Sequence, residues 1–219
     1  MSGLILAVDT TAEFGSLALG GEEILLHAPD GFGAVIFEHI ERLLQRTGLC
    51  LADLDGFAAA SGPGSFTGVR IGLACVKGLA EAAGKPAFAV SNLAALARFG
   101  STDLRVPVID ARRGEVYAAV YGAGGNVIVP ETVCPFPLVL ARLPESQVEF
   151  IFQNFGPFEA ALAGTRFAGC PVVMAPRALA AVVARIAEER LAAGDTGDPA
   201  GLDANYVRRS DAELLFKPW

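Results

Sequence analysis

The amino-acid sequence predicts an α/β protein built from two copies of one βββαβαβα lobe. Short apolar runs of strand length alternate with longer stretches whose apolar residues have helical spacing. The same order of elements occurs in each half, and each half opens with a strand that ends in an aspartate, Asp9 or Asp110. We therefore expect residues 1–100 and 101–219 to form two RNase H-like lobes that face each other across a cleft, with the boundary at residues 100–102.

Three strands joined by short turns open the first half. The first apolar run ends at Asp9, the second follows a polar turn, and the third follows Gly20 and its neighbouring glycine. Residues 34–47 have apolar side chains at helical spacing, and Gly48 can end that helix. The strands predicted in the first half are 4–8, 16–19, 22–27, 56–60 and 86–90, and the helices are 34–47, 66–83 and 91–99.

The second half repeats this layout. Its first three strands are predicted around the two turns ARRG and GAGG. Its longest predicted helix has Pro176 in the first helical turn, where proline is well tolerated. The predicted strands are 104–110, 115–121, 127–129, 148–152 and 171–174, and the predicted helices are 137–142, 157–163 and 176–193.

Composition excludes several classes of protein. Hydrophobic residues make up 53% and charged residues 19%, which argues for a packed core and against disorder. The net charge of −7 provides no broad basic surface for direct nucleic-acid binding. No apolar run approaches the roughly 20 residues of a membrane span, and the four cysteines form no CxxC pair, so we expect a cytoplasmic protein with reduced cysteines in its core.

The two strand-ending aspartates are the first candidates for chemistry. In a duplicated fold of this kind they would point into the cleft, where Asp9 and Asp110 could hold Mg²⁺ and nucleotide phosphates with help from the hydroxyls of Thr10 and Thr11. Alternatively, both aspartates only satisfy the backbone amides of their turns. The second alternative is favoured because residues 148–219 contain no glycine-rich loop for an adenosine.

The loop SGPGSFTGVR, residues 61–70, is the most distinctive segment. It turns the chain from a buried strand into a helix, with Ser65 or Thr67 placed to cap that helix, so its free N–H groups could bind a phosphate. It matches neither a Walker A loop nor GxGxxG. A compact turn whose glycines provide backbone room is an equal alternative, and Gly68 and Gly72 would then allow close packing to the same lobe or to a partner.

Three segments resemble one family. They are ILAVDTTAEFGSLAL, ASGPGSFTGVRIGLACVKGLA and VPVIDARRGEVYAAVY, and they are similar to TsaB (YeaZ), the accessory subunit of the bacterial machinery for N6-threonylcarbamoyladenosine in tRNA. The closing segment ANYVRRSDAE is similar to the tail of that family. The resemblance covers essentially the whole chain and is strongest over residues 4–20, 56–98 and 105–121.

The resemblance implies an ASKHA-type fold, a cytoplasmic location, and neither catalysis nor a cofactor in this chain alone. Members of the family pair with the homologous catalytic subunit TsaD, and act with the ATPase TsaE, to modify adenosine 37 of ANN-decoding tRNAs. Contact with tRNA is then mainly through the partner, and no membrane is involved. Asp9, Thr10, Thr11 and Asp110 would be a vestigial phosphate site.

Pairing in this family uses the two first-lobe helices, which correspond here to residues 34–47 and 66–83, and the same surface can form a homodimer. The first of these helices has a second, partly apolar face, which predicts two neighbours. The predicted partner-binding residues are Phe32, Val35, His39, Arg42, Arg70, Leu73 and Lys77. A Mg²⁺/ATP-dependent phosphotransferase that uses Asp9 and Asp110 remains the alternative function.

Overall fold

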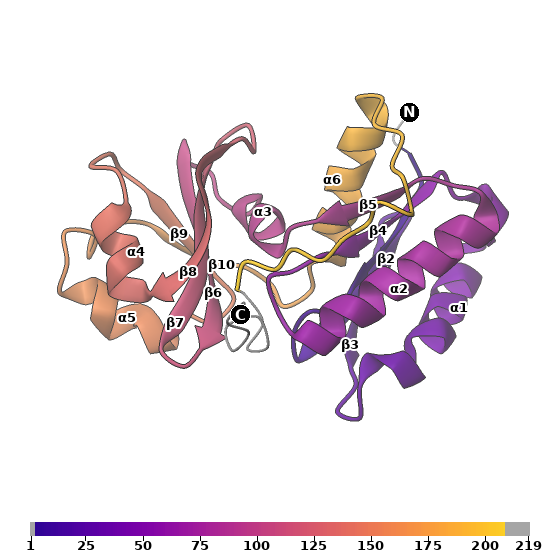
Figure 1. Cartoon of the computed structure of the whole chain (residues 1–219), viewed down its shortest axis with the longest axis horizontal. Helices are drawn as coiled ribbons and strands as arrows, with labels where there is room; N and C mark the ends of the chain where they lie inside the picture. The colour runs from indigo at the N-terminus through magenta and orange to yellow at the C-terminus, as the bar shows by residue number, and fades with distance from the viewer. Residues whose placement is uncertain (1–2, 209–219) are drawn as a thin grey trace, which may run out of the picture. The chain divides into compact units, whose positions relative to one another are not determined.

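The computed structural model describes residues 3–208 and divides the chain into two compact units, each with its own five-stranded sheet (Figure 1). The first unit runs up to Ala95 and also contains Pro176–Ala204, and the second contains Leu96–Ala175 and the described residues after Ala204. The predicted α/β class and the order of strands and helices in each half are confirmed.

The first sheet has the strand order β3-β2-β1-β4-β5. Strands β1, β2 and β3 are antiparallel neighbours, whereas β4 pairs in parallel with both β1 and β5. Helices α1 and α2 lie side by side on one face of this sheet, and α6 covers the other (Figure 1). The strands are β1 (Ile5–Asp9), β2 (Phe14–Leu19), β3 (Glu22–His27), β4 (Gly56–Ala60) and β5 (Ala87–Val90).

The helices of the first unit begin and end at the signals that the sequence provides. Helix α1 ends at Gly48, whose φ of 70° suits glycine, and α2 begins after Ser65, whose hydroxyl accepts the Gly68 N–H at 3.3 Å. Ile40 of α1 and Val76 of α2 are buried against the sheet in one apolar core. The helices are α1 (Ile36–Thr47), α2 (Phe66–Ala83) and α6 (Ala180–Ala192), with short 3-10 turns η1 (Phe32–Ala34) and η2 (Leu51–Asp53). Helix α3 (Asn92–Ala97) begins in the first unit and ends in the second.

The second sheet has the equivalent order β10-β9-β6-β7-β8. Its core is rich in phenylalanine, with Phe136 in edge-to-face contact with Phe150, Phe152 and Phe158. The third predicted strand, 127–129, continues to Pro135. The elements are β6 (Leu104–Arg112), β7 (Glu115–Gly122), β8 (Val127–Pro135), β9 (Glu149–Phe152), β10 (Val172–Met174), α4 (Phe136–Arg142) and α5 (Gly156–Ala163).

Helix α6 lies in a different unit from the one predicted. The sequence places residues 176–193 in the lobe 101–219, whereas α6 packs on β1, β2 and β4 of the first sheet. The hydroxyl of Ser16 on β2 accepts the N–H groups of Leu179 at 3.1 Å and Ala180 at 2.9 Å. The physical reason is that the strands of the first sheet are buried on both faces, so a second helical layer is needed to cover it.

The cysteines are all free thiols, but they do not share one environment. Cys75 and Cys134 are buried as predicted, and burial raises the pKa of Cys75 to about 11. Cys50 is exposed, because it lies in the turn after α1 and not in the core. None of the helices in residues 3–208 is long and apolar enough to cross a membrane.

Candidate functional site

The turn after β1 holds the most tightly bonded polar cluster of the first unit. Asp9 is only 2% exposed, and its Oδ1 accepts the Thr11 N–H at 2.9 Å and the Thr11 hydroxyl at 2.6 Å. The amide Nδ2 of buried Asn92 donates to the Thr11 hydroxyl oxygen at 2.7 Å. Thr10 points elsewhere and donates to the carbonyl oxygen of Gly68 at 2.7 Å. The carboxylate and both hydroxyls therefore bind to the protein itself.

The loop 61–70 packs directly on this turn. Asn92 Oδ1 accepts the Gly62 N–H at 2.9 Å, and the Ser65 N–H donates to the Thr11 carbonyl oxygen at 2.6 Å. A Cβ atom placed on Gly64 would lie 2.4 Å from the same Thr11 oxygen. Glycine is therefore required here by backbone contact, which supports the compact-turn interpretation of the loop over the phosphate-binding one.

Close contact with Thr10, in the same turn, explains two glycines of α2. A Cβ on Gly68 would lie 1.9 Å from the Thr10 carbonyl oxygen, and one on Gly72 would lie 2.7 Å from the Thr10 hydroxyl oxygen. Both glycines thus bring α2 close to β1 of its own unit. Of the two alternatives that the sequence left open, these contacts favour packing within the lobe.

Burial raises the pKa of Asp9 above its usual value, although the hydrogen bonds from Thr11 and Asn92 oppose this shift. As the pH rises above about 4, the unfolded chain ionises at this residue before the folded one does, so stability falls through the folded pKa. We expect Asp9→Asn, whose Oδ1 can still accept from Thr11, to remove this loss.

Urea unfolding of both proteins between about pH 4 and pH 8 tests this prediction. The free energy of unfolding of Asp9→Asn should rise relative to that of the parent chain as the pH increases. A free energy of unfolding of Asp9→Asn that stays constant relative to that of the parent chain, or falls relative to it as the pH rises, would contradict a raised pKa at Asp9.

Asp110 has a different environment in the second unit. It is exposed, its Oδ1 accepts the Arg112 N–H at 2.7 Å, and its Oδ2 lies 3.7 Å from a guanidinium nitrogen of Arg112. Both Asp9 and Asp110 therefore satisfy backbone amides of their own turns, as the favoured alternative predicts. Among residues 3–208, no three His, Cys, Asp or Glu side chains form a group that could hold a metal ion.

The predicted partner-binding residues fall into three groups by exposure. Phe32 and Leu73 are each 6% exposed and belong to the first core, so they support the helices from beneath. The Lys77 amine donates to the Ala200 carbonyl oxygen at 3.3 Å, within the same unit. Val35, just before α1, and His39, within it, are half-buried. Helical spacing alone does not distinguish buried from half-buried positions, because burial depends on what packs against each side of the helix.

Arg42 and Arg70 are the two predicted residues that are exposed. Arg42 forms an ion pair with Glu38 one turn away. The guanidinium of Arg70 lies 3.7 Å from the ring centre of Phe66, which is itself 50% exposed.

The predicted partner-binding residues do not include the exposed phenylalanines and alanines of these helices. Phe37 of α1 is 59% exposed, one of several large apolar side chains exposed on the described surface. On α2, exposed residues recur at every fourth position and form a ridge that winds slowly around the helix, because four residues exceed the 3.6 of one turn. This outer face of α2 consists of Phe66, Arg70, Ala74, Gly78 and Ala82. The sequence of residues 66–83 contains a second row of apolar and small residues at helical spacing, and this row could have indicated the exposed face.

Comparisons with known proteins agree with this architecture. Residues 31–192 match the family model described as TsaD, tRNA N6-adenosine threonylcarbamoyltransferase. The tRNA threonylcarbamoyladenosine biosynthesis protein TsaB of Bacillus subtilis is 30% identical over 97% of each chain. TsaB of Escherichia coli is 38% identical, and that match spans 57% of each chain.

A solved structure supports the same assignment. YeaZ from Pseudomonas aeruginosa superimposes with a TM-score of 0.75 and 28% identity, over 93% of this chain and 99% of the other. A family model covering most of the chain and a relative aligned over nearly its whole length together establish the family. The chain belongs to the TsaB (YeaZ) family and has its ASKHA-like α/β fold with two mixed five-stranded sheets.

Proposed function

We propose that this chain is a non-catalytic subunit that binds and activates a TsaD-type transferase in the cytoplasm. That transferase transfers a threonylcarbamoyl group to adenosine 37 of ANN-decoding tRNAs, and a TsaE-type ATPase is the third component. In this proposal the chain carries out no reaction step and holds no cofactor. The observation that carries the proposal is the outer face of α2, which is exposed and largely apolar, together with the exposed Phe37 of α1.

The outer face of α2 has the composition of a helix-packing surface. Ala74, Gly78 and Ala82 are small, so the backbone of a second helix can approach closely along this row. Phe66 at the start of the row and Phe37 on the neighbouring helix would lose exposed apolar surface on pairing, at about 25 cal/mol per Å² buried. A partner with an equivalent pair of helices fits this surface, whether it is the transferase or a second copy of this chain.

The alternative function, a Mg²⁺/ATP-dependent phosphotransferase, draws no support from the residues it would use. Asp9 is buried and bonded to Thr11, while the Thr10 hydroxyl donates to the Gly68 carbonyl oxygen. A ligand could reach these groups only by displacing the bonds that attach loop 61–65 to β1. The contacts favour the vestigial interpretation of the phosphate site.

The proposal predicts that Ala74→Glu prevents the pairing. A carboxylate at this position would be buried against the partner helix, and we expect affinity to fall by at least about 30-fold, or roughly 2 kcal/mol. Ala160→Glu is the matched control, because Ala160 is an exposed alanine of α5 in the other unit. The chain would be mixed with the TsaD homologue of its own organism, and the molar mass followed by light scattering after gel filtration.

A one-to-one complex with the parent chain and with Ala160→Glu, but not with Ala74→Glu, is the expected result. Asp9→Asn should also form the complex and support tRNA modification. Failure of the parent chain to bind the transferase at tens of micromolar would overturn the proposal. Complete loss of modification by a folded, partner-bound Asp9→Asn would favour the phosphotransferase alternative.

A further inference from the structure

The second unit contains a small apolar cavity between its sheet and helix α4. The cavity has a volume of about 80 Å³ and is partly open to the surface. It lies beside an irregularity in the pairing of β7 with β8, where two residues of β8 oppose the single Ala119 of β7. The side chains that line the cavity include those of Val120, Val129, Thr132, Val139, Arg142 and Leu143.

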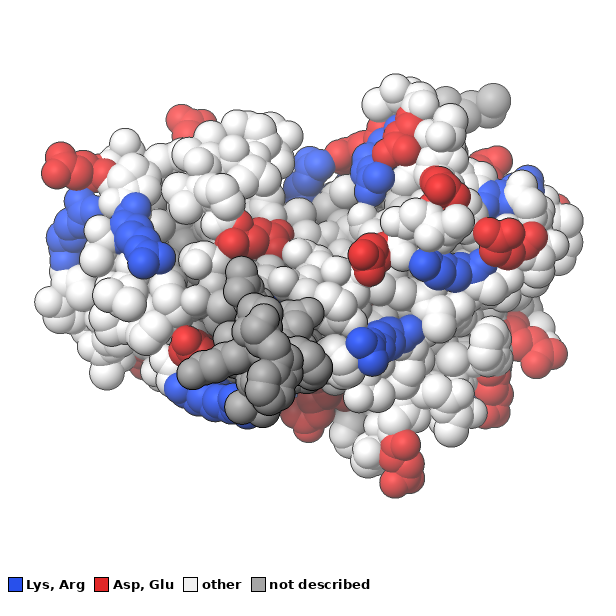
Figure 2. Space-filling view, in the orientation of Figure 1, with Lys and Arg blue, Asp and Glu red and all other residues white. Residues whose placement is uncertain are grey.

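The surface beside this cavity is also apolar. Val127 and Ile128, at the start of β8, are 55% and 48% exposed, and Leu138 of α4 is 47% exposed. Strand β8 is an edge of the described sheet. Figure 2 shows that uncharged side chains cover most of the second unit on the viewed face. The cavity together with Val127, Ile128 and Leu138, here named the α4–β8 patch, therefore suits an apolar segment of chain.

A cation lies at the rim of the cavity. Arg142 lines the cavity, and the residue is exposed. No carboxylate of residues 3–208 forms an ion pair with Arg142. An apolar segment that also carries an acidic residue therefore fits the α4–β8 patch better than a purely apolar segment does.

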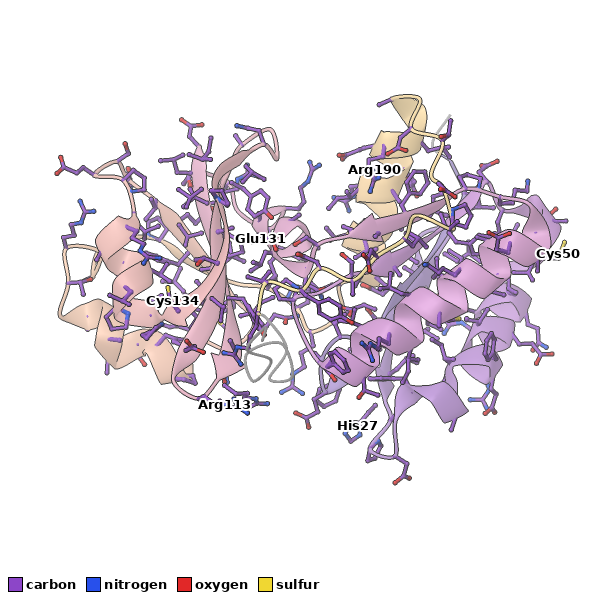
Figure 3. All side chains as sticks on the ribbon, viewed as in Figure 1. His27, Cys50, Arg113, Glu131, Cys134 and Arg190 are labelled. Carbon is purple, nitrogen blue, oxygen red and sulfur yellow. The ribbon has the colours of Figure 1, made fainter. Side chains whose placement is uncertain are left out.

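The described chain ends close to this patch, on the other face of the sheet. Arg208 forms an ion pair with Glu115, which pairs with Pro135 at the end of β8. Asn205 donates to Glu131 at 2.6 Å, and Figure 3 shows Glu131 on the side of the sheet away from Cys134 and α4. The chain that follows Arg208 can reach the patch by passing around the free edge of β8.

The length of the remaining chain is sufficient for this route. From Pro135 to the cavity at Thr132 is about 10 Å along β8, and crossing from one face of the sheet to the other adds about 10 Å. The sequence continues after Arg208 with RSDAELLFKPW, residues 209–219, which lie outside the described part of the structure. Residues 209–215 can span up to about 23 Å when extended, which exceeds the route of roughly 20 Å.

We propose that residues 213–216 of the same chain, with the sequence ELLF, dock on the α4–β8 patch, with a leucine in the cavity and Glu213 beside Arg142. An engineered cavity of about 150 Å³ is large enough for benzene. The present cavity, at about 80 Å³, therefore accepts an aliphatic side chain and not the ring of Phe216 or Trp219. Glu213 gives Arg142 the acidic partner that residues 3–208 do not provide. The docking is a property of the isolated chain and does not depend on the proposed function.

Methyl NMR spectroscopy of the full chain tests the docking directly. The protein would be isotopically labelled at the methyl groups of leucine and valine in a deuterated background. We expect nuclear Overhauser effects from a methyl group of Leu214 or Leu215 to the cavity. The receiving methyl groups are those of Val129, Val139 and Leu143. Leu214→Ser/Leu215→Ser should shift these three receiving resonances, because the variant removes the apolar group that contacts them.

Leu25→Ser is the matched control for the leucine variant. Leu25 is another exposed leucine, at 52%, on β3 of the first unit, so its replacement should leave the three cavity resonances unchanged. Glu213→Arg places a second cation beside Arg142. It should lower the ratio of docked to undocked chain by about two- to fivefold, the effect expected of a partly exposed ion pair. Exchanging the two charges in Arg142→Glu/Glu213→Arg should restore this ratio to within about twofold.

Absence of contacts between the two leucines and the cavity would overturn the inference. Contacts that arise only between differently labelled molecules would also overturn it, because the occupant would then be a second copy of the chain. Contacts from these leucines to the outer face of α2 would do the same. Failure of the charge exchange to restore docking would overturn the pairing of Glu213 with Arg142. All these measurements use the isolated chain, so none of these outcomes bears on its pairing with the transferase.

Discussion

Gly68→Ala is expected to destabilise the protein by about 3 kcal/mol or more, because overpacking of a rigid site exceeds the usual cost of a core substitution. The new Cβ would lie 1.9 Å from the Thr10 carbonyl oxygen and 3.0 Å from the Thr10 carbonyl carbon. Both are backbone atoms at the end of β1, so no side-chain rotation can relieve the overlap. Either α2 or the turn after β1 must move.

Gly78→Ala is the control on the same helix. No atom lies within 4 Å of a Cβ built at Gly78, which is exposed. Alanine should therefore stabilise α2 by about 0.5–1 kcal/mol, since glycine is the poorer helix former. Urea unfolding monitored by circular dichroism, with the slope of the transition unchanged, would measure both effects. A cost below about 1 kcal/mol for Gly68→Ala would show that α2 approaches β1 less closely than described.

Asn92→Ala has the second-largest expected effect. The side chain is 3% exposed and joins two segments, because its Oδ1 accepts the Gly62 N–H and its Nδ2 donates to the Thr11 hydroxyl. Its removal leaves a buried N–H group without this acceptor and opens a small cavity. We expect a loss of about 2–4 kcal/mol in the free energy of unfolding.

The same variant should also change the pH dependence of stability. The hydrogen bond from Asn92 lowers the pKa of Asp9, so its loss raises that pKa further. A higher folded pKa means that more stability is lost as the pH rises, and the deficit of Asn92→Ala should therefore grow as the pH increases from about 4 to about 8. Asn154→Ala is the control, because Asn154 is exposed and substitutions at such sites usually change stability by less than about 0.5 kcal/mol. Equal deficits for the two variants would contradict the bridging role of Asn92.

Elements with a strong local signal were predicted well. Helix α1 ends at Gly48 as predicted, and α2 has the predicted bounds, 66–83, because a capping serine and a left-handed glycine flank it. The strands on either side of Gly20 and Gly21 are also in place. In each case the determining interactions lie within a few residues of the chain.

Exposure within a helix was predicted less well. Phe32 and Leu73 were expected on the partner-binding surface and lie in the core, whereas the exposed Phe37 and Phe66 were not singled out. A helical pattern assigns residues to sides of the helix, but only the position of the sheet decides which side is covered. Neighbouring helices can cover part of a second side, so the boundary between core and surface is a tertiary property.

The sequence by itself determined the α/β class, the repeated order of elements and the family, because these depend on periodicity, turn residues and motifs that are local in the chain. The tertiary structure alone decided that α6 covers the first sheet and that Asn92 bonds to Thr11 in the turn after β1. It also decided that Arg112 and Arg113 adopt left-handed backbone. The first two depend on contacts between segments that are distant in the sequence, and the third depends on the register in which β6 pairs with β7. Local sequence patterns do not reveal such contacts.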